Sequence, residues 1–339
     1  MGINENGLSF GILKKGARNL ITDVPGVRVG HVTLRSGSIQ TGVTALIPGE
    51  GSCFRMKFPA AVHVINGFGK SAGLMQLKEL GSLETPILLT NTFSVAACTE
   101  GLLDYMLADH PEIGTTTGTV NCVVAECNDS RLNDIRARNI KPEHALEALN
   151  NAGEDFEEGA VGAGRGMSCY GWKGGIGSAS RIIKLGGEKY TVGALLLTNF
   201  GSKRDFTIAG VRQGSVSMPE TADRGSCIML LATDLPLSCR QLERCTHRAQ
   251  NGLARTGTIT GGGSGEVVIM FSTANRIPHD SAEKLRSVRI LHEDCLDEVF
   301  RAVAETVEES VVSSVYHAVT VTGIDGHTVR RFPWEERNI

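Results

Sequence analysis

The pair Gly225-Ser226 could supply an unusual nucleophile. Ser226 opens an apolar run that extends to Thr233, with the length of a buried strand, and Asp234 and Pro236 end it. If the peptide bond before Ser226 were broken, this residue would carry both a hydroxyl nucleophile and a neutral α-amine of suitable basicity. A Gly-Ser pair alone usually marks a turn before a strand, so the surrounding residues decide its meaning.

Four other polar residues could serve such a nucleophile. Ser264 and Glu266 stand two apart after the triple glycine 261–263, and strand alternation sends both side chains to the same side. A glutamate beside a serine could orient a nucleophile and shuttle its proton. Asn199 ends one strand and could donate its amide to an oxyanion, and Glu126 ends another and could pair with a substrate ammonium group. Each residue alone is more often part of a turn.

Ser71 is a competing nucleophile. Gly69, Ser71 and Gly73 follow a strand and precede a helix, which is the nucleophile-elbow pattern of α/β-hydrolases, although a glycine-rich turn explains it as well. The stretch 67–72 also fits a relaxed dinucleotide fingerprint, but the next strand ends in Asn91 instead of the expected acid. A phosphate-binding loop is excluded because Val64 stands where its first glycine is required.

Composition excludes several other classes. The net charge of −3 and the absence of Lys/Arg clusters interleaved with aromatics give no nucleic-acid footprint. The nine histidines and nine cysteines contain no His-Glu-x-x-His and no Cys-x-x-Cys, so we expect no metal site. Most cysteines lie in apolar runs, as in a reducing compartment, and we find neither a membrane-spanning segment nor a signal peptide. The expected location is therefore the cytoplasm.

The elements that must position these residues are mixed strands and helices without a strict βαβ alternation, which predicts an α+β fold with layered sheets. Strands are expected on both sides of the glycine turn at 261–263. A capping box from Ser238 to Gln241 and the proline at 142 predict helix starts, and apolar residues from Leu296 onward predict a long helix. The polar segment 201–224 is the best candidate for an exposed, cleavable stretch.

Several longer motifs, in order along most of the chain, make this sequence resemble the family of the L-aminopeptidase D-Ala-esterase/amidase and the β-peptidyl aminopeptidases. The motifs are Ile21 to His31, Pro86 to Thr92, Glu126-Cys127-Asn128-Asp129 with Leu132 to Ile135, Lys173 to Arg181, Gly225-Ser226, Ala232-Thr233-Asp234, Gly252 to Gly257, Gly263-Ser264-Gly265-Glu266 and Phe271 to Asn275.

The resemblance implies an αββα four-layer sandwich that looks like the N-terminal-nucleophile hydrolases but has different connectivity. It implies one domain, 1–339, that cleaves itself between Gly225 and Ser226 into an α part, 1–225, and a β part, 226–339. Carried over by motif, Ser226 is the nucleophile, assisted and oriented by Ser264 and Glu266. Asn199 and a backbone N–H near residue 227 would form the oxyanion hole, and Glu126 would lie near the substrate amine.

The resemblance also implies that no cofactor is needed, that the substrate is a small peptide, amide or ester, and that the protein is a homo-oligomer, often a tetramer in this family. Two alternatives remain: a serine esterase that uses Ser71 in an α/β-hydrolase fold, and a non-processing binding protein on the same sandwich. Some family members place a tyrosine at the oxyanion site, and none of the four tyrosines here aligns with it. Substrate identity, α- or β-peptide, D or L residue, amide or ester, is left open.

Overall fold

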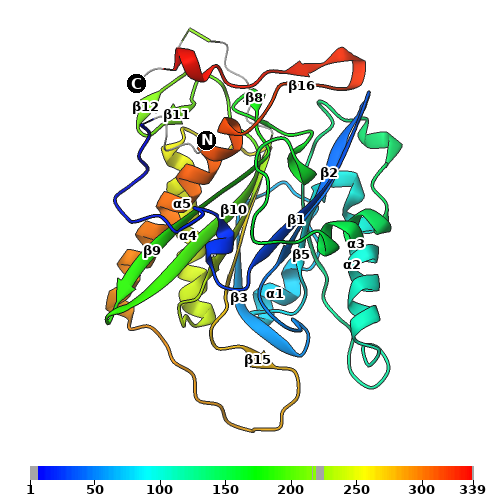
Figure 1. Cartoon of the computed structure of the whole chain (residues 1–339), viewed down its shortest axis with the longest axis vertical. Helices are drawn as coiled ribbons and strands as arrows, with labels where there is room; N and C mark the ends of the chain where they lie inside the picture. Colours follow the sequence, from blue (N-terminus) through cyan, green and yellow to red (C-terminus); the bar gives the residue numbers. More distant parts are fainter. Residues whose placement is uncertain (1–6, 216, 219–224, 338–339) are drawn as a thin grey trace.

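Two sheets stacked face to face form the centre of the computed structural model, which describes residues 7–215, 217–218 and 225–337 (Figure 1). One apolar cluster fills the space between the sheets, and two others lie between each sheet and its outer helices. The order of layers is therefore helix, sheet, sheet, helix. The predicted α+β class and the αββα sandwich are confirmed.

The smaller sheet has the strand order β1-β2-β5-β6. β1 and β2 form a long antiparallel hairpin through Gly37, whose φ of +52° suits the tight turn, whereas β5 and β6 run parallel. This parallel pair matters for the site because its strands end at the same edge. The bounds are β1 (Arg28–Ser36), β2 (Ile39–Ile47), β5 (Ile87–Asn91) and β6 (Val123–Cys127).

The larger sheet has the order β15-β3-β14-β13-β10-β9, and β4 pairs with β3. β13 lies inside it, antiparallel to β10 and parallel to β14, and all of its residues are buried. Burial on both faces explains why the sequence of β13 is an unbroken apolar run without polar alternation. The bounds are β3 (Met56–Gly67), β4 (Ser82–Leu83), β9 (Ile176–Leu185), β10 (Glu188–Asn199), β13 (Ser226–Thr233), β14 (Gly265–Ser272) and β15 (Ile277–Pro278).

Helices cover the outer faces, with α4 and α5 on the larger sheet and α2 and α3 on the smaller one (Figure 1). The predicted capping box is present at the start of α4, where Ser238 and Gln241 exchange side-chain-to-backbone hydrogen bonds. The helix predicted at residue 142 also begins there. The bounds are α1 (Leu74–Leu80), α2 (Val95–Asp109), α3 (Pro142–Asn150), α4 (Cys239–Arg255) and α5 (Leu296–Tyr316).

The strand predicted before the triple glycine is wrong. Residues 256–264 form a loop, and Thr260 has a φ of +52°, a left-handed conformation that a strand residue does not adopt. The Thr258 hydroxyl accepts the Thr260 N–H in place of a ladder bond. In the expected cleavable segment 201–224, residues 216 and 219–224 lie outside the described residues.

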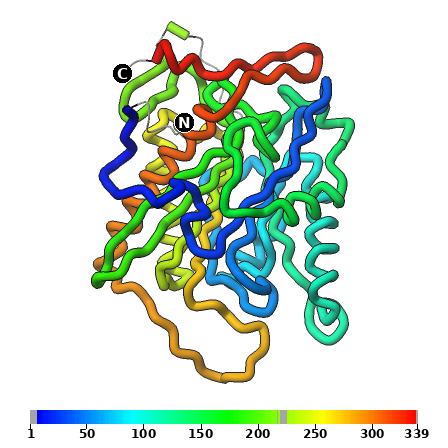
Figure 2. Tube along the Cα trace, in the orientation of Figure 1, coloured from blue at the N-terminus to red at the C-terminus, as the bar shows by residue number. Residues whose placement is uncertain are grey.

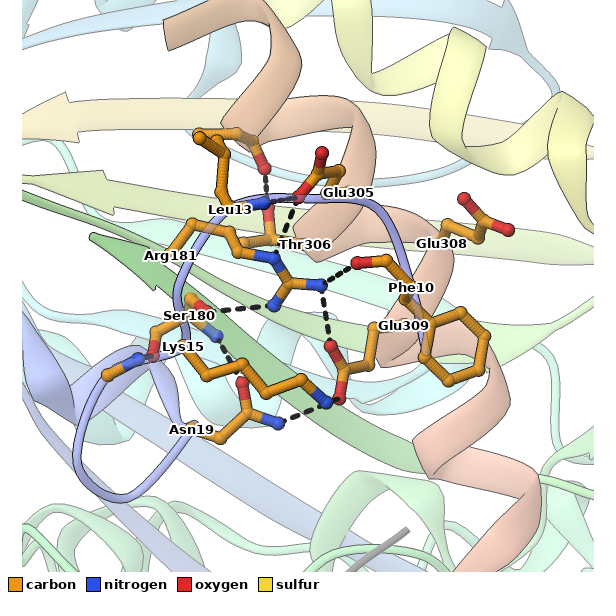
Figure 3. Close-up of polar contacts among 12 residues, drawn as sticks. Phe10, Leu13, Lys15, Asn19, Ser180, Arg181, Glu305, Thr306, Glu308 and Glu309 are labelled. Atoms are coloured by element: carbon orange, nitrogen blue, oxygen red, sulfur yellow. Dashed lines mark hydrogen bonds and ion pairs between the residues drawn. The ribbon is translucent and has the colours of Figure 1, made fainter. Parts of the chain in front are cut away.

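A buried ionic cluster fixes α5 to the larger sheet and holds the chain near its start (Figure 3). Arg181 of β9 is fully buried and contacts Glu305 at 3.0 Å and Glu309 at 2.7 Å, both on α5. It also donates to the Phe10 carbonyl at 2.6 Å, while the N–H of Ile12 donates to Glu305. Removing one partner of such a pair would leave a buried charge without its counter-charge, so the cluster stabilises the contact between α5 and the sheet.

A long connection, residues 279–292, projects from the body of the molecule between β15 and α5 (Figure 2). Three short hairpins lie in other loops: β7 (Ser168–Cys169) with β8 (Trp172–Lys173), β11 (Thr207–Ile208) with β12 (Val211–Arg212), and β16 (Val321–Thr322) with β17 (Thr328–Val329). Within the described residues, no helix combines the length and the apolar composition that crossing a bilayer requires.

Candidate active site

Ends of several strands of the larger sheet meet at Ser226. The register pairs Ser226 with Asn199, the last residue of β10, and with Gly265, the first residue of β14. Because β10 runs antiparallel to β13 and β14 runs parallel to it, the end of one strand and the starts of the other two share one edge. Ser264 and Glu266 flank Gly265 in the chain. The structure therefore brings together four of the predicted site residues.

The hydroxyl of Ser226 lies against the carbonyl of the residue before it. Ser226 Oγ donates to the Gly225 carbonyl oxygen at 2.7 Å, and the N–H of Gly265 donates to the same oxygen at 3.1 Å. Ser226 is 6% exposed. A nucleophile and a backbone donor thus meet at one peptide carbonyl, where negative charge would develop if the hydroxyl attacked.

Gly225 has no space for a side chain. A Cβ atom at this position would lie 1.8 Å from the Asn199 carbonyl oxygen and 2.6 Å from Phe200 Cα, both backbone atoms that cannot move aside independently. The close approach of the two backbones therefore requires glycine at 225, which explains physically why this residue type precedes the serine.

Ser264 and Glu266 form a fully buried pair in which the hydroxyl donates to Glu266 Oε1. The amide of Asn66, near the end of β3, donates to the Ser264 carbonyl and holds the turn. The register pairs Glu266 with Cys227, whose side chain faces the helices, whereas the side chain of Ile228 faces the other sheet. Glu266 therefore lies on the face of the sheet opposite to the Ser226 hydroxyl, beside the backbone of residue 226.

Asn199 is held by both ends of its amide. Its Oδ1 accepts the N–H of Ser168 at 3.0 Å, and its Nδ2 donates to the carbonyl of Asn128 at 2.9 Å. An amide nitrogen carries two N–H donors, and the bond to Asn128 uses one of them. A fixed side chain with a second donor at the edge beside Ser226 has the properties of an oxyanion-hole group.

Glu126 stands at the facing edge of the smaller sheet, 3% exposed. Its Oε1 accepts the backbone N–H of Lys70 at 2.8 Å, and its Oε2 accepts the hydroxyl of Thr92, which directly follows β5. Each carboxylate oxygen has further lone pairs, so Glu126 can still bind a cation. A carboxylate fixed at both oxygens presents its charge in one direction.

The loop after β6 joins the two halves of the site across the gap between the sheets. The Asn128 carbonyl receives the Asn199 amide, and the Cys127 thiol lies 3.7 Å from the Leu197 carbonyl oxygen of β10. Burial, and then the charge of Glu126, raise the pKa of Cys127 well above its ordinary value. This thiol therefore stays protonated and packs as a small apolar group.

The structure does not support Ser71 as a nucleophile. Its hydroxyl oxygen is buried and has no hydrogen-bond partner among the described residues, so no base activates it. The preceding strand, β3, pairs antiparallel with its neighbours, unlike the parallel strands around a nucleophile elbow. The tyrosine near Asn199 is Tyr170, and its hydroxyl is bound to the Thr256 hydroxyl at 2.7 Å.

Sequence reasoning missed three groups: the hydroxyl of Thr92 and the N–H groups of Lys70 and Gly265. Thr92 ends the motif Pro86 to Thr92, but that motif does not connect its hydroxyl with Glu126. The parallel pairing of β5 with β6, which aligns Thr90 with Glu126, would have located it. The other two are backbone donors, which any residue provides. In the described part of the chain, no group of three or more His, Cys, Asp or Glu side chains could hold a metal ion.

Comparisons with known proteins place the chain in a family. A model of peptidase family S58 matches residues 19–329. The β-peptidyl aminopeptidase BapA of Sphingosinicella microcystinivorans is 37% identical over 351 residues, which cover 95% of this chain and 87% of that protein.

Two solved structures are similar over nearly the whole chain. The PH0078 protein of Pyrococcus horikoshii OT3 shares 50% identity and a TM-score of 0.95, covering 99% of this chain and 97% of that one. The L-aminopeptidase D-Ala-esterase/amidase of Ochrobactrum anthropi, described as a prototype of serine aminopeptidases and a new variant among the Ntn hydrolase fold, shares 34% identity and a TM-score of 0.91. That match covers 98% of this chain and 95% of that one.

Proposed function

The chain belongs to peptidase family S58, and on this basis we propose that it is a serine aminopeptidase or amidase that activates itself by cleaving the bond between Gly225 and Ser226. The single domain would become an α part, 1–225, and a β part, 226–339. The observation that carries the proposal is the Ser226 hydroxyl bound to the Gly225 carbonyl oxygen, which the Gly265 N–H also binds.

Self-cleavage begins with attack of Ser226 Oγ on the carbonyl carbon of Gly225. The oxygen of that carbonyl gains negative charge, and the Gly265 N–H stabilises it at the position where it already donates. The C–N bond then breaks, the amine of residue 226 takes up the proton, and an ester links residues 225 and 226. Water hydrolyses this ester and leaves a free α-amine on Ser226.

In the processed enzyme the α-amine of residue 226 acts as the base for its own hydroxyl, because a neutral amine is available near pH 8. The Ser264–Glu266 pair lies beside the backbone of residue 226, and we assign it to orienting this amine. The hydroxyl attacks an N-terminal peptide, amide or ester bond, the leaving group departs with the proton, and water resolves the acyl-enzyme.

Asn199 and Glu126 bind two different groups of the substrate, the oxyanion and the free ammonium group. The second N–H of the Asn199 amide donates to the substrate oxyanion, together with a backbone N–H near residue 227. Glu126, fixed by Lys70 and Thr92, pairs with the free ammonium group of the substrate. This pairing restricts cleavage to the first residue of a peptide.

Substrates are peptides, as in the family, and the proposal extends to small amides and esters with a free amine. We further propose a cytoplasmic homo-oligomer, with a tetramer as the specific form. Sedimentation of the purified protein measures the oligomeric state. A panel of aminoacyl nitroanilides with α- or β-, D- or L-residues identifies the preferred N-terminal residue.

The purified chain on a denaturing gel tests the proposal. We expect two fragments whose masses correspond to 1–225 and 226–339, with Ser226 as the new N-terminus, and a single intact chain in Ser226→Ala. Ser71→Ala serves as the control and should be processed normally. An intact wild-type chain that hydrolyses aminoacyl substrates at a rate unchanged in Ser226→Ala would rule the proposal out.

A further inference from the structure

The opposite end of β3 carries another serine with a polar environment of its own. Ser52 lies four residues before β3 begins at Met56, whereas Gly67 at the far end of β3 pairs with Gly265 beside Ser226. The strand has 12 residues. At about 3.3 Å per residue, such a strand separates its two ends by roughly 36–40 Å, so groups around Ser52 do not take part in chemistry at Ser226.

The imidazole of His110 contacts Ser52 through one nitrogen and Glu112 through the other. The distance from Ser52 Oγ to His110 Nε2 is 2.9 Å, and His110 Nδ1 is 3.3 Å from Glu112 Oε1. His110 follows the last residue of α2, and the end of this helix brings the ring to the turn that holds Ser52. A serine at one imidazole nitrogen and a carboxylate at the other is the constellation in which an imidazole takes the serine proton.

The hydrogen bonds around Ser52 set the direction of its proton. Ser52 Oγ accepts the backbone N–H of Arg55 at 3.0 Å. A hydroxyl has one hydrogen and two lone pairs, so Ser52 can donate to His110 Nε2 and still keep a lone pair for attack. His110 must then carry its hydrogen on Nδ1, which faces Glu112.

Glu112 is suited to stabilise a protonated His110. Its own backbone N–H, and then the Arg55 guanidinium 2.7 Å away and the His110 ring, hold the pKa of Glu112 below its ordinary value against partial burial. Oε1 of Glu112 is buried and has these ion-pair contacts but no hydrogen-bond partner among the described residues. A carboxylate oxygen has two lone pairs, so Oε1 can accept a bond from Nδ1–H beside its contact with Arg55 when charge develops on the ring.

Packing restricts the ring and the space in front of it. The side chain of His110 is 12% exposed, and its ring lies 5.3 Å from that of Phe54. Ser52 and His110 line a cavity of about 60 Å³ together with Arg28 and Tyr105. Because this cavity is small, we expect the site to take a short acyl group, such as acetyl, in preference to a long acyl chain.

We propose that Ser52, His110 and Glu112 form a second hydrolytic site, which cleaves esters of short acyl groups. The Ser52 proton moves to His110 Nε2 as Oγ bonds to the ester carbonyl carbon. The bond to the alcohol oxygen then breaks, and the alcohol leaves with the proton from Nε2. Water, deprotonated by the same nitrogen, attacks the acyl-serine, the acid is released, and Ser52 Oγ regains its proton. No further reactant is required.

Labelling with a fluorophosphonate, which phosphonylates base-activated serines, tests the nucleophile. The chain used is full-length Ser226→Ala, so that the serine of the proposed peptidase site cannot react. We expect the label on the peptide that contains Ser52, and no label at this peptide after His110→Ala. Added imidazole should restore labelling of His110→Ala, a rescue that a merely misfolded variant would not show.

Hydrolysis of para-nitrophenyl acetate tests turnover in the same Ser226→Ala background. Loss of the general base should lower the rate by about 10²- to 10⁴-fold in His110→Ala, and Ser52→Ala should show only the uncatalysed rate. The octanoate ester should be a poor substrate, and Thr117→Val, which alters the neighbouring His279 without touching Ser52, should hydrolyse the acetate normally.

The proposal is overturned if Ser52 stays unlabelled, if its labelling does not depend on His110, or if Ser52→Ala hydrolyses the acetate ester as fast as its parent. Label on Ser71 in place of Ser52 would instead support an esterase at the glycine-rich turn. None of these results depends on whether the chain cleaves itself.

Discussion

A serine hydroxyl lies near each end of β3, and the two serines differ in whether a base is already available to them. At one end, the Ser52 hydroxyl contacts an imidazole whose other nitrogen faces a carboxylate. At the other end, the Ser226 hydroxyl donates to the carbonyl of the residue before it, and its base would be its own amine, which is still part of a peptide bond. One serine is already paired with a base, and the other must first release its base.

The groups that surround the two serines differ in the same way. The Ser226 end has backbone packed so closely that Gly225 cannot carry a Cβ, together with a backbone donor on the carbonyl to be cleaved. The Ser52 end has side chains from two loops and a small cavity. Changes that block scission should therefore abolish chemistry at Ser226 and leave the labelling of Ser52 unaffected.

Gly225→Ala should have the largest effect. The new Cβ would overlap the Asn199 carbonyl oxygen, so the scissile peptide must move away from the Gly265 N–H. We expect no processed fragments after overnight incubation and no aminopeptidase activity, with Ser52 labelled as in the parent. Gly262→Ala, where a Cβ would meet nothing within 4 Å, is the matched control and should be processed. Normal processing of Gly225→Ala would show that the close backbone packing at residue 225 is not required for cleavage.

Asn199→Asp should have the next largest effect. Aspartate keeps the oxygen that accepts the Ser168 N–H and has nearly the same volume, but it can donate neither to an oxyanion nor to the Asn128 carbonyl. Loss of one such donor should lower kcat of the processed enzyme by about 10²–10³-fold. Steady-state rates on an aminoacyl nitroanilide measure this, and similar melting temperatures would show that the fold is retained. A loss of less than threefold would remove Asn199 from the oxyanion hole.

Glu266→Gln tests whether the released amine is the base at Ser226. A carboxylate near an amine favours its charged form, so removing the charge should lower the pKa of the amine. The acidic limb of the pH–rate profile of processed protein should then shift to lower pH by about one unit. Ser52 labelling should keep its own pH profile. An unchanged peptidase profile would mean that Glu266 does not act on the amine.

Much of the fold followed from local patterns. The unbroken apolar run after Ser226 predicted β13 because a strand buried on both faces has no polar alternation, and the capping box at 238–241 predicted the start of α4. Asn199 and Glu126 were recognised as polar residues at strand ends, although the sequence could not say that these ends face each other. The strand before the triple glycine was wrong because β-branched threonines favour strands, while Thr260 adopts a left-handed turn.

What could not be predicted depends on contacts between segments far apart in the sequence. Ser52 and His110 are 58 positions apart, and their meeting depends on where the end of α2 lies relative to the turn before β3. The lack of space at Gly225 is due to backbone atoms of Asn199 and Phe200. No side chain type in the sequence indicates such a backbone contact. Motif reasoning finds residues that are neighbours in sequence or shared with a known family. It singles out Gly225 by its type, but it shows neither the backbone that Gly225 packs against nor the meeting of Ser52 with His110.

Thr92→Val should have the smallest effect and act on binding alone. It removes the hydroxyl that holds Glu126 Oε2 while Lys70 still binds Oε1, so the carboxylate remains charged but less well directed. A hydrogen bond to a charged group contributes about 1.5–3 kcal/mol. Because the Lys70 N–H still binds the carboxylate, we expect KM for a peptide to rise about tenfold with kcat nearly unchanged. Thr92→Ser keeps the hydroxyl and should behave like the parent.

The same variant separates recognition of the amine from chemistry at the serine. An N-acetylated substrate has no ammonium group, so its slow hydrolysis should be insensitive to Thr92→Val, as should self-cleavage, which involves no free amine in its first step. If Thr92→Val lowered kcat and left KM unchanged, Glu126 would act in the chemical step at Ser226. Two carboxylates, Glu126 and Glu266, would then act in the chemistry at Ser226, against Glu112 alone at Ser52, and the position of the base would still distinguish the two serines.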